Sequence, residues 1–255
     1  MKNIVISLES AVERRKHINE EFGKHKVDFE FFDALTPDLA HAYAQNLPIN
    51  LENIALTGGE LACFMSHASV WQQMIDQNIP YLAIFEDDIY LGEDAEALLT
   101  TTSWIKPDWH IIKTEAFSEK VFLSSNSSDI VSNRRRIAQL KGKNLGTAGY
   151  ILSLRGAQVY LDYISKNKLR PLDELMFDDF IKHGAEPVYQ MIPTICIQEM
   201  LLNKGNPSLP SALITDRQGR MKSEKKPAMF KAKREINRIG MKLKKSIFAT
   251  EVVFK

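Results

Sequence analysis

The sequence contains no long apolar run and only two cysteines among its 255 residues. No stretch approaches the roughly eighteen uninterrupted apolar residues that a membrane-spanning helix needs. The opening segment, MKNIVISLE, becomes charged too early for a secretory signal. Cys63 and Cys196 cannot form a disulfide framework, and neither has the spacing of a metal site. These absences favour a protein of a reducing, cytoplasmic compartment.

The common phosphate-binding loops are also missing, since neither GxGxxG nor GxxxxGK[ST] occurs, and there is no internal repeat. What is present is an alternation of short apolar runs with helical patterns. We expect strands at 2–8, 29–32, 81–85, 109–114 and 146–153, and helices at about 10–23, 57–77, 94–101, 155–165 and 172–183. The polar stretch 118–136 is expected to be a surface loop or a weak hairpin. This order predicts a doubly wound α/β domain, which binds ligands at the carboxyl ends of its strands.

Two helix starts carry the spacing of a capping box. Ser10 is followed by Glu13, and Thr57 is followed by Glu60. Gly23 is a residue type that often ends a helix. The sequence therefore predicts side-chain caps at Ser10 and Thr57, and a helix end at about Gly23.

Three adjacent acids, Glu86, Asp87 and Asp88, follow the apolar run 81–85. In a partly dry site these carboxylates would repel one another unless a cation neutralised them, and hard oxygen ligands suit Mg²⁺ or Mn²⁺. Alternation along an extended chain puts Glu86 and Asp88 on one side and Asp87 on the other. Glu86 and Asp88 thus have the spacing of a DxD-type clamp for a metal and a diphosphate. The alternative is a solvated acidic turn.

Further motifs stand before and after this cluster in a fixed order. They are Val5–Leu8, Ala11, Arg14–Arg15, Phe31–Ala34, Gly59–His67, Trp71, Phe85–Asp88, Gly146–Tyr150, Pro171–Asp173 and Gln198–Glu199. As an ordered set they resemble the bacterial lipooligosaccharide glycosyltransferases of family 25, over roughly residues 1–200, and most of all its β-1,4-galactosyltransferases. The resemblance implies a GT-A-like fold, a Rossmann-like mixed sheet flanked by helices. It also implies UDP-galactose as donor, inversion at the anomeric carbon, and lipooligosaccharide as acceptor.

The resemblance also suggests roles for individual residues. Glu86 and Asp88 would hold Mn²⁺ or Mg²⁺ against the donor diphosphate, with Asp88 as the main ligand. The candidates for contact with the donor itself are Ser7, Leu8, Arg14, Asp33, Ser66, His67, Glu86, Asp87 and Gly149. Glu86 is thus a candidate both for the metal and for the donor. Arg14 or Arg15 would contact phosphate, and Asp33 would accept a hydrogen bond from ribose or uracil.

Several of these candidates have a simpler structural explanation. Arg14 has the alternative of a solvated helix face, and Asp33 that of an Asx-turn. Cys63 and His67 share a helix face, but a metal site there lacks further ligands, so a packed cysteine beside a bonded histidine is expected. Trp71 is expected in the core. Tyr150 has two interpretations, a sugar-stacking ring or part of a sheet strand crowded by a helix.

The catalytic base of an inverting transfer should be a carboxylate that faces the acceptor hydroxyl. The candidates are Asp173, Glu174, Asp178 and Asp179, and Asp173 is preferred because it matches the Pro-x-Asp motif of the family. An N-cap role is the rival explanation for Asp173. Gln198 and Glu199 are expected near donor or metal. A histidine that some relatives carry after this Glu is replaced by leucine here, so no histidine metal ligand is expected there.

The charge is unevenly distributed along the chain. Residues 217–255 contain 13 Lys and Arg against 3 Asp and Glu, a net charge of +10, whereas the rest of the chain has a net charge of −9. Within 228–248 the apolar residues recur at helical spacing. We therefore expect a glycosyltransferase domain at 1–215 and a basic amphipathic helical tail at 216–255. The tail would bind the inner-membrane surface, making the protein a cytoplasmic peripheral enzyme. Packing on the body or on a partner subunit is the alternative, and no nucleic-acid motif accompanies the charge.

Three other functions compete with galactose transfer. The chain could transfer glucose or an N-acetylhexosamine, since few pocket residues choose the sugar. It could be a silent sugar-nucleotide or glycan-binding protein, although such a binder has little need of three repelling carboxylates. A metal-dependent phosphohydrolase is the weakest rival, because the His and Asp clusters of a two-metal site are missing.

Overall fold

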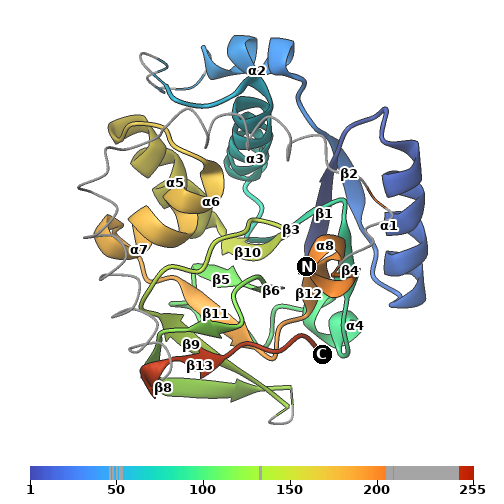
Figure 1. The fold of residues 1–255 in the computed structure, drawn as a ribbon, viewed down its shortest axis with the longest axis vertical. Helices are drawn as coiled ribbons and strands as arrows, with labels where there is room; N and C mark the ends of the chain where they lie inside the picture. Colours follow the sequence, from blue (N-terminus) through green and yellow to red (C-terminus); the bar gives the residue numbers. More distant parts are fainter. Residues whose placement is uncertain are drawn as a thin grey trace.

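The computed structural model describes residues 1–45, 47, 49, 51, 54–131, 134–204, 209 and 247–255. Its centre is an eight-stranded mixed sheet with the strand order β2-β1-β3-β10-β5-β11-β9-β8 (Figure 1). The strands are β1 Lys2–Ser7, β2 Glu30–Asp33, β3 Tyr81–Glu86, β5 Ile111–Lys113, β8 Leu123–Ile130, β9 Arg135–Leu140, β10 Gly149–Ser153 and β11 Tyr189–Ile192. Strands β2, β1 and β3 are parallel, and β10 runs antiparallel between β3 and β5. The expected α/β class with a mixed sheet is confirmed.

Helices cover both faces of this sheet (Figure 1). They are α1 Val12–Lys24, α2 Pro37–Ala44, α3 Gly58–Asp76, α4 Ala95–Leu99, α5 Leu154–Lys166, α6 Leu172–Glu174, α7 Phe180–His183 and α8 Glu199–Leu202, with a π-helical segment η1 at Leu175–Asp179. Because side chains alternate along a strand, β1 sends Ile4 and Ile6 into the core under α2, α3 and α5, and Val5 into the core under α1 and α4. Burial on both faces explains the unbroken apolar runs of β1 and β3.

The two predicted helix caps have opposite outcomes. Thr57 accepts a hydrogen bond from the Glu60 amide, and the Glu60 carboxylate accepts one from the Thr57 amide, so the capping box of α3 is confirmed. The cap at Ser10 is wrong, because α1 begins after Ala11 without a side-chain cap. The expected end of this helix at about Gly23 is confirmed to within one residue, since α1 ends at Lys24.

Of two further expectations, one is confirmed in one of its two forms and the other needs correction. The stretch 118–136, expected to be a surface loop or a weak hairpin, contains β7 Lys120–Val121, β8 and the start of β9, and β8 and β9 pair antiparallel as a hairpin at one edge of the main sheet. Pairing in the tertiary structure overrides the weak strand propensity of its Ser and Asn residues. The single helix expected at 172–183 is divided into α6, η1 and α7, with a kink at Phe177.

Two small sheets complete the fold. One contains β4 Ile89–Leu91, β12 Cys196–Gln198 and β6 Glu115–Ala116, and the other pairs β7 with β13 Thr250–Glu251. The last residues of the chain therefore lie on the body, where Phe254 also bridges to Thr194. Most of the predicted basic tail, namely residues 216–246, lies outside the described residues. Within the described part of the chain, no helix is both long and apolar enough to cross a membrane.

Candidate functional site

The acidic cluster Glu86, Asp87 and Asp88 lies where β3 ends and turns into β4. Asp87 points to β1 and α1: the Ser7 hydroxyl donates to its Oδ2 at 2.6 Å, and Arg14 Nη1 donates to its Oδ1 at 2.5 Å. Arg14 Nη2 also lies 3.7 Å from Asp88 Oδ2. Asp87 is thus neutralised by the chain itself, and Arg14, expected at a phosphate, lies against the acidic cluster.

Glu86 and Asp88 lie on the other side and share a neutral donor. The Gln198 amide nitrogen is 3.4 Å from Glu86 Oε2 and 3.3 Å from Asp88 Oδ1. Gln198 reaches this place because β12 pairs with β4, with Gln198 opposite Ile89. Thr147 donates a further hydrogen bond to Glu86 Oε1 at 2.6 Å. The expected alternation of the three acids is therefore present.

The two carboxylates differ in their electrostatic surroundings. Burial and the neighbouring Glu86 charge raise the pKa of Asp88 to about 6, against the opposing effects of Arg14 and Gln198. Burial also acts to raise the pKa of Glu86, but His67, Thr147 and Arg14 outweigh it and the net pKa is lowered. Asp88 is only 7% exposed. An ionised Asp88 beside an ionised Glu86 thus lacks full compensation, which is the condition in which hard oxygen ligands take up a divalent cation.

A chain of buried aromatic groups reaches Glu86 from α3. Trp71 Nε1 donates to the Tyr150 hydroxyl at 2.9 Å, and this hydroxyl lies 2.7 Å from His67 Nδ1. His67 Nε2 lies 3.7 Å from Glu86 Oε1. The expected core position of Trp71 is confirmed. The sugar-stacking interpretation of Tyr150 is wrong, because the ring is fully buried.

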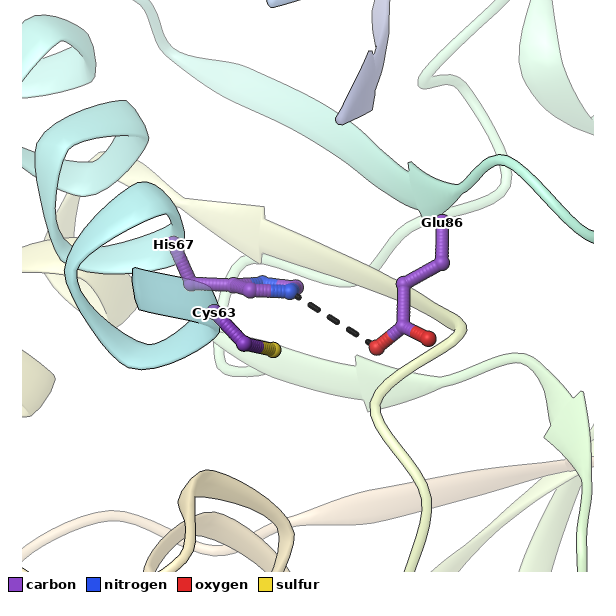
Figure 2. Close-up of side chains that lie close together, drawn as sticks. All are labelled: Cys63, His67 and Glu86. Atoms are coloured by element: carbon purple, nitrogen blue, oxygen red, sulfur yellow. Dashed lines mark ion pairs between the residues drawn. The ribbon is translucent and has the colours of Figure 1, made fainter. Parts of the chain in front are cut away.

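Cys63 lies on the same face of α3 as His67, and both point toward Glu86 (Figure 2). One potential ligand atom from each of the three residues lies within 4.8 Å of the other two. The expectation that Cys63 and His67 lack a further ligand is therefore wrong. The third group comes from a different element, β3, and sequence spacing does not reveal it.

A buried ion pair supports the loop that carries Thr147. Lys113 and Glu115 are both fully buried, and Lys113 Nζ lies 2.8 Å from Glu115 Oε2 and 2.5 Å from the Gly146 carbonyl oxygen. Glu115 Oε2 also accepts the Ala148 amide hydrogen bond at 3.1 Å. Gly146 has φ +87°, and a side chain there would collide with the Glu115 carboxylate. The pair thus fixes the backbone on both sides of Thr147.

Sequence reasoning missed Thr147, Lys113 and Glu115 as parts of this arrangement. Thr147 lies between the glycines of a quoted motif, which was a usable signal. Lys113 and Glu115 carried none, since a Lys and a Glu two residues apart are ordinary on a surface strand. Only the parallel pairing of β6 with β12 and the antiparallel pairing of β5 with β10 bury them.

Other predicted donor residues lie around the ends of β1 and β2. Leu8 is 37% exposed, and Arg15 forms an ion pair with the exposed Asp33 and also donates to the Ser7 carbonyl. The Ser66 hydroxyl is buried; it donates to Ala62 O and accepts from the Leu35 amide, so its bonds join α3 to the segment after β2.

Gly149 is packed within the protein, since a side chain there would collide with Cys196 Sγ. Its small size is therefore required by internal packing. The donor-binding roles of Gly149, Ser7, Leu8, Asp33 and Ser66 remain predictions.

The structure places the base candidates on α6 and η1. Asp173 is 7% exposed, and its Oδ1 accepts a hydrogen bond from the Glu174 amide at 2.9 Å. Asp178 lies between Lys143 and Lys182, and Asp179 accepts from the Tyr163 hydroxyl. The role of Asp173 as base remains a prediction.

Comparison with known proteins identifies the class. Residues 1–176 match the model of glycosyltransferase family 25, described as an LPS biosynthesis protein. The chain therefore belongs to this family and is a glycosyltransferase.

Among its relatives is the lacto-N-neotetraose biosynthesis glycosyltransferase LgtE of Neisseria gonorrhoeae, 38% identical over 96% of this chain and 92% of that one. LgtB of Neisseria meningitidis is 41% identical over 78% of this chain and 76% of that one. The lipooligosaccharide biosynthesis protein lex-1 of Haemophilus influenzae is 36% identical over 90% of this chain and 86% of that one.

A solved glycosyltransferase involved in the glycosylation of the major capsid of PBCV-1 covers 71% of this chain and 72% of that one, with 8% identity and a TM-score of 0.36. This likeness is too low to assign a fold family, so the GT-A-like assignment remains a prediction.

Proposed function

We propose that this protein transfers galactose from UDP-galactose to a terminal sugar of lipooligosaccharide, with inversion, and with a divalent cation at Glu86 and Asp88. The observation that carries the proposal is the arrangement of the acidic cluster. Asp87 is neutralised by Arg14 and Ser7, whereas Glu86 and Asp88 converge on one neutral amide. The relatives whose names refer to lacto-N-neotetraose and lipooligosaccharide biosynthesis support the acceptor class.

The residues fit Mn²⁺ or Mg²⁺ because they offer only hard oxygen ligands at a site where like charge is incompletely compensated. When bound, the cation would act as a Lewis acid on the diphosphate of the donor. Gln198 and Thr147 would hold the two carboxylates in place. Arg14 would keep Asp87 out of competition for the cation by pairing with it, while Asp173 would accept the proton of the acceptor hydroxyl.

The basic segment 216–255 would bring the enzyme to the membrane that carries its acceptor. Leu209, which precedes this segment, is held by Glu199, whose carboxylate accepts the Leu209 amide hydrogen bond at 2.7 Å, and by Arg14. At Leu209, before the basic segment, the chain therefore lies beside the acidic cluster. Such an origin is compatible with an anchor that keeps the site close to anionic lipid.

The test is turnover of a panel of UDP-sugars with lactose- and glucose-terminated acceptors, in the presence of Mn²⁺, Mg²⁺ or a chelator. Transfer from UDP-galactose that requires the cation supports the proposal. Transfer from UDP-glucose or a UDP-N-acetylhexosamine instead would replace the sugar and keep the chemistry. Tight UDP binding without turnover of any donor would favour the silent binder.

A further inference from the structure

The cluster Cys63, His67 and Glu86 has a chemistry that the proposed transfer does not use. A thiol, an imidazole and a carboxylate converge from α3 and β3, and their potential ligand atoms lie within 4.8 Å of one another (Figure 2). His67 is fully buried, and its Nε2 has no hydrogen-bond partner, although it faces Glu86 Oε1 at 3.7 Å. A buried ring nitrogen that has no hydrogen-bond partner and lies close to a thiol and a carboxylate is a candidate metal ligand.

We propose that Cys63, His67 and Glu86 bind a borderline-soft cation of the Zn²⁺ class. Sulfur and imidazole ligands select such an ion over Mg²⁺ or Mn²⁺. Cys63 and His67 are four residues apart on α3, so their side chains lie one turn apart on the same face. Three protein ligands leave a fourth tetrahedral position for water or phosphate. The Glu86 side chain is 24% exposed, so solvent reaches the cluster at this ligand.

The surroundings of His67 suit this role. The Tyr150 hydroxyl accepts from Trp71 and lies 2.7 Å from His67 Nδ1, so it can donate to this nitrogen in one tautomer of the ring and accept from it in the other. With a cation on Nε2, the ring proton would sit on Nδ1 and the Tyr150 oxygen would accept it, so that the ring keeps an outer hydrogen bond as metal-bound histidines do. Cys63 binds as the thiolate and releases its proton to solvent.

The consequence is competition for Glu86. A carboxylate drawn to Zn²⁺ between Cys63 and His67 is no longer free to hold the hard cation shared with Asp88. Zn²⁺ is therefore an inhibitor of the transfer, and Cys63 is the residue that makes it one. This part of the inference rests on the proposed function, whereas the binding of the cation does not.

The binding test uses Co²⁺ as a spectroscopic probe on the full, chelator-treated chain. A thiolate-to-cobalt charge-transfer band should appear, and Zn²⁺ should abolish it by displacement. Cys63→Ser should remove the band and weaken Zn²⁺ binding by at least about a hundredfold. The matched control is Cys196→Ser, which leaves Cys63 as the single thiol and should keep the band. No band in the wild type, or a band that survives Cys63→Ser, overturns the site.

The inhibition test compares transfer rates with and without Zn²⁺ in the wild type and in Cys63→Ser. Basal turnover should be unchanged in the variant, and the Zn²⁺ concentration for half-inhibition should rise at least about tenfold. Equal zinc sensitivity of the two proteins overturns the competition. Asp88→Asn separates the two proposals, because it should lose transfer and retain the cobalt–thiolate band.

Discussion

Two groups of charged side chains lie close together in this protein and differ in the partners that compensate their charge. Lys113 and Glu115 carry opposite charges, are fully buried, and contact each other and the backbone. Glu86 and Asp88 carry like charges and share the neutral amide of Gln198. The first group has both partners of its ion pair within the chain and holds a loop in place. The second has two like charges and no such internal ion pair between its members, and in the proposed function a divalent cation would complete it.

The largest expected effect comes from breaking the structural pair. Lys113→Met leaves Glu115 and the Gly146 carbonyl without their cation, and we expect a loss of about 3–5 kcal/mol in the free energy of unfolding. Urea denaturation measures this loss. Lys182→Met is the matched control, since Lys182 pairs with Asp178 at the surface and should change stability little. Equal losses of unfolding free energy in both variants would show that the buried pair contributes no more to stability than the surface pair.

The next effect concerns the ligand-binding group. Asp88→Asn keeps the shape of the side chain but removes the charge of the proposed metal ligand, so the transfer rate should fall at least about a hundredfold. Stability should not fall, because the repulsion between Asp88 and Glu86 is relieved. Steady-state kinetics at saturating Mn²⁺, together with thermal unfolding, test both statements. The exposed Asp162→Asn is the control; a fully active Asp88→Asn enzyme would remove Asp88 from the clamp.

The pH dependence of stability sharpens the comparison further. The pKa of Asp88 is raised from 3.8 to about 6, so the folded chelator-treated protein holds this proton more tightly than the unfolded chain. Stability should therefore fall as pH rises from about 4 to about 6, by up to about 3 kcal/mol.

Burial outweighs the Lys113 charge and raises the pKa of Glu115 from 4.5 to about 7, so a second decrease in stability should follow up to about pH 7. Unfolding free energies should be measured across this range with and without Mn²⁺. The cation should abolish the decrease in stability that Asp88 causes and leave the decrease that Glu115 causes. If Mn²⁺ abolished neither decrease, the assignment of Asp88 as a metal ligand would be contradicted.

The smallest expected effect lies at the link between the two groups. Thr147→Val removes one hydrogen bond to Glu86, whose loss costs about 1 kcal/mol. The apparent Mn²⁺ affinity should fall about fivefold, since each 1.4 kcal/mol corresponds to a factor of ten. Thr101→Val, at an exposed position, serves as the control in the same metal titration. An unchanged affinity would mean that the loop positions Glu86 through its backbone alone.

The sequence by itself determined the α/β class, strands β1 and β3, the capping box at Thr57, and the acidic cluster with its alternation. These features depend on local patterns: apolar runs, a Thr-to-Glu spacing of three, and three acids at the end of a strand. The same local reasoning failed at Ser10, where α1 begins without a side-chain cap. It left 118–136 open between a loop and a hairpin, and the pairing of β8 with β9 decides in favour of the hairpin.

Only the tertiary structure decided which groups surround the acids. Gln198 is brought to Asp88 by the pairing of β12 with β4, and Glu86 meets Cys63 because α3 crosses the end of β3. Such contacts join residues more than twenty positions apart, and no periodicity in the sequence encodes them. The sequence specifies which side chains a strand presents at its end, whereas the packing of distant elements decides which of their charges the chain neutralises and which remain for a ligand.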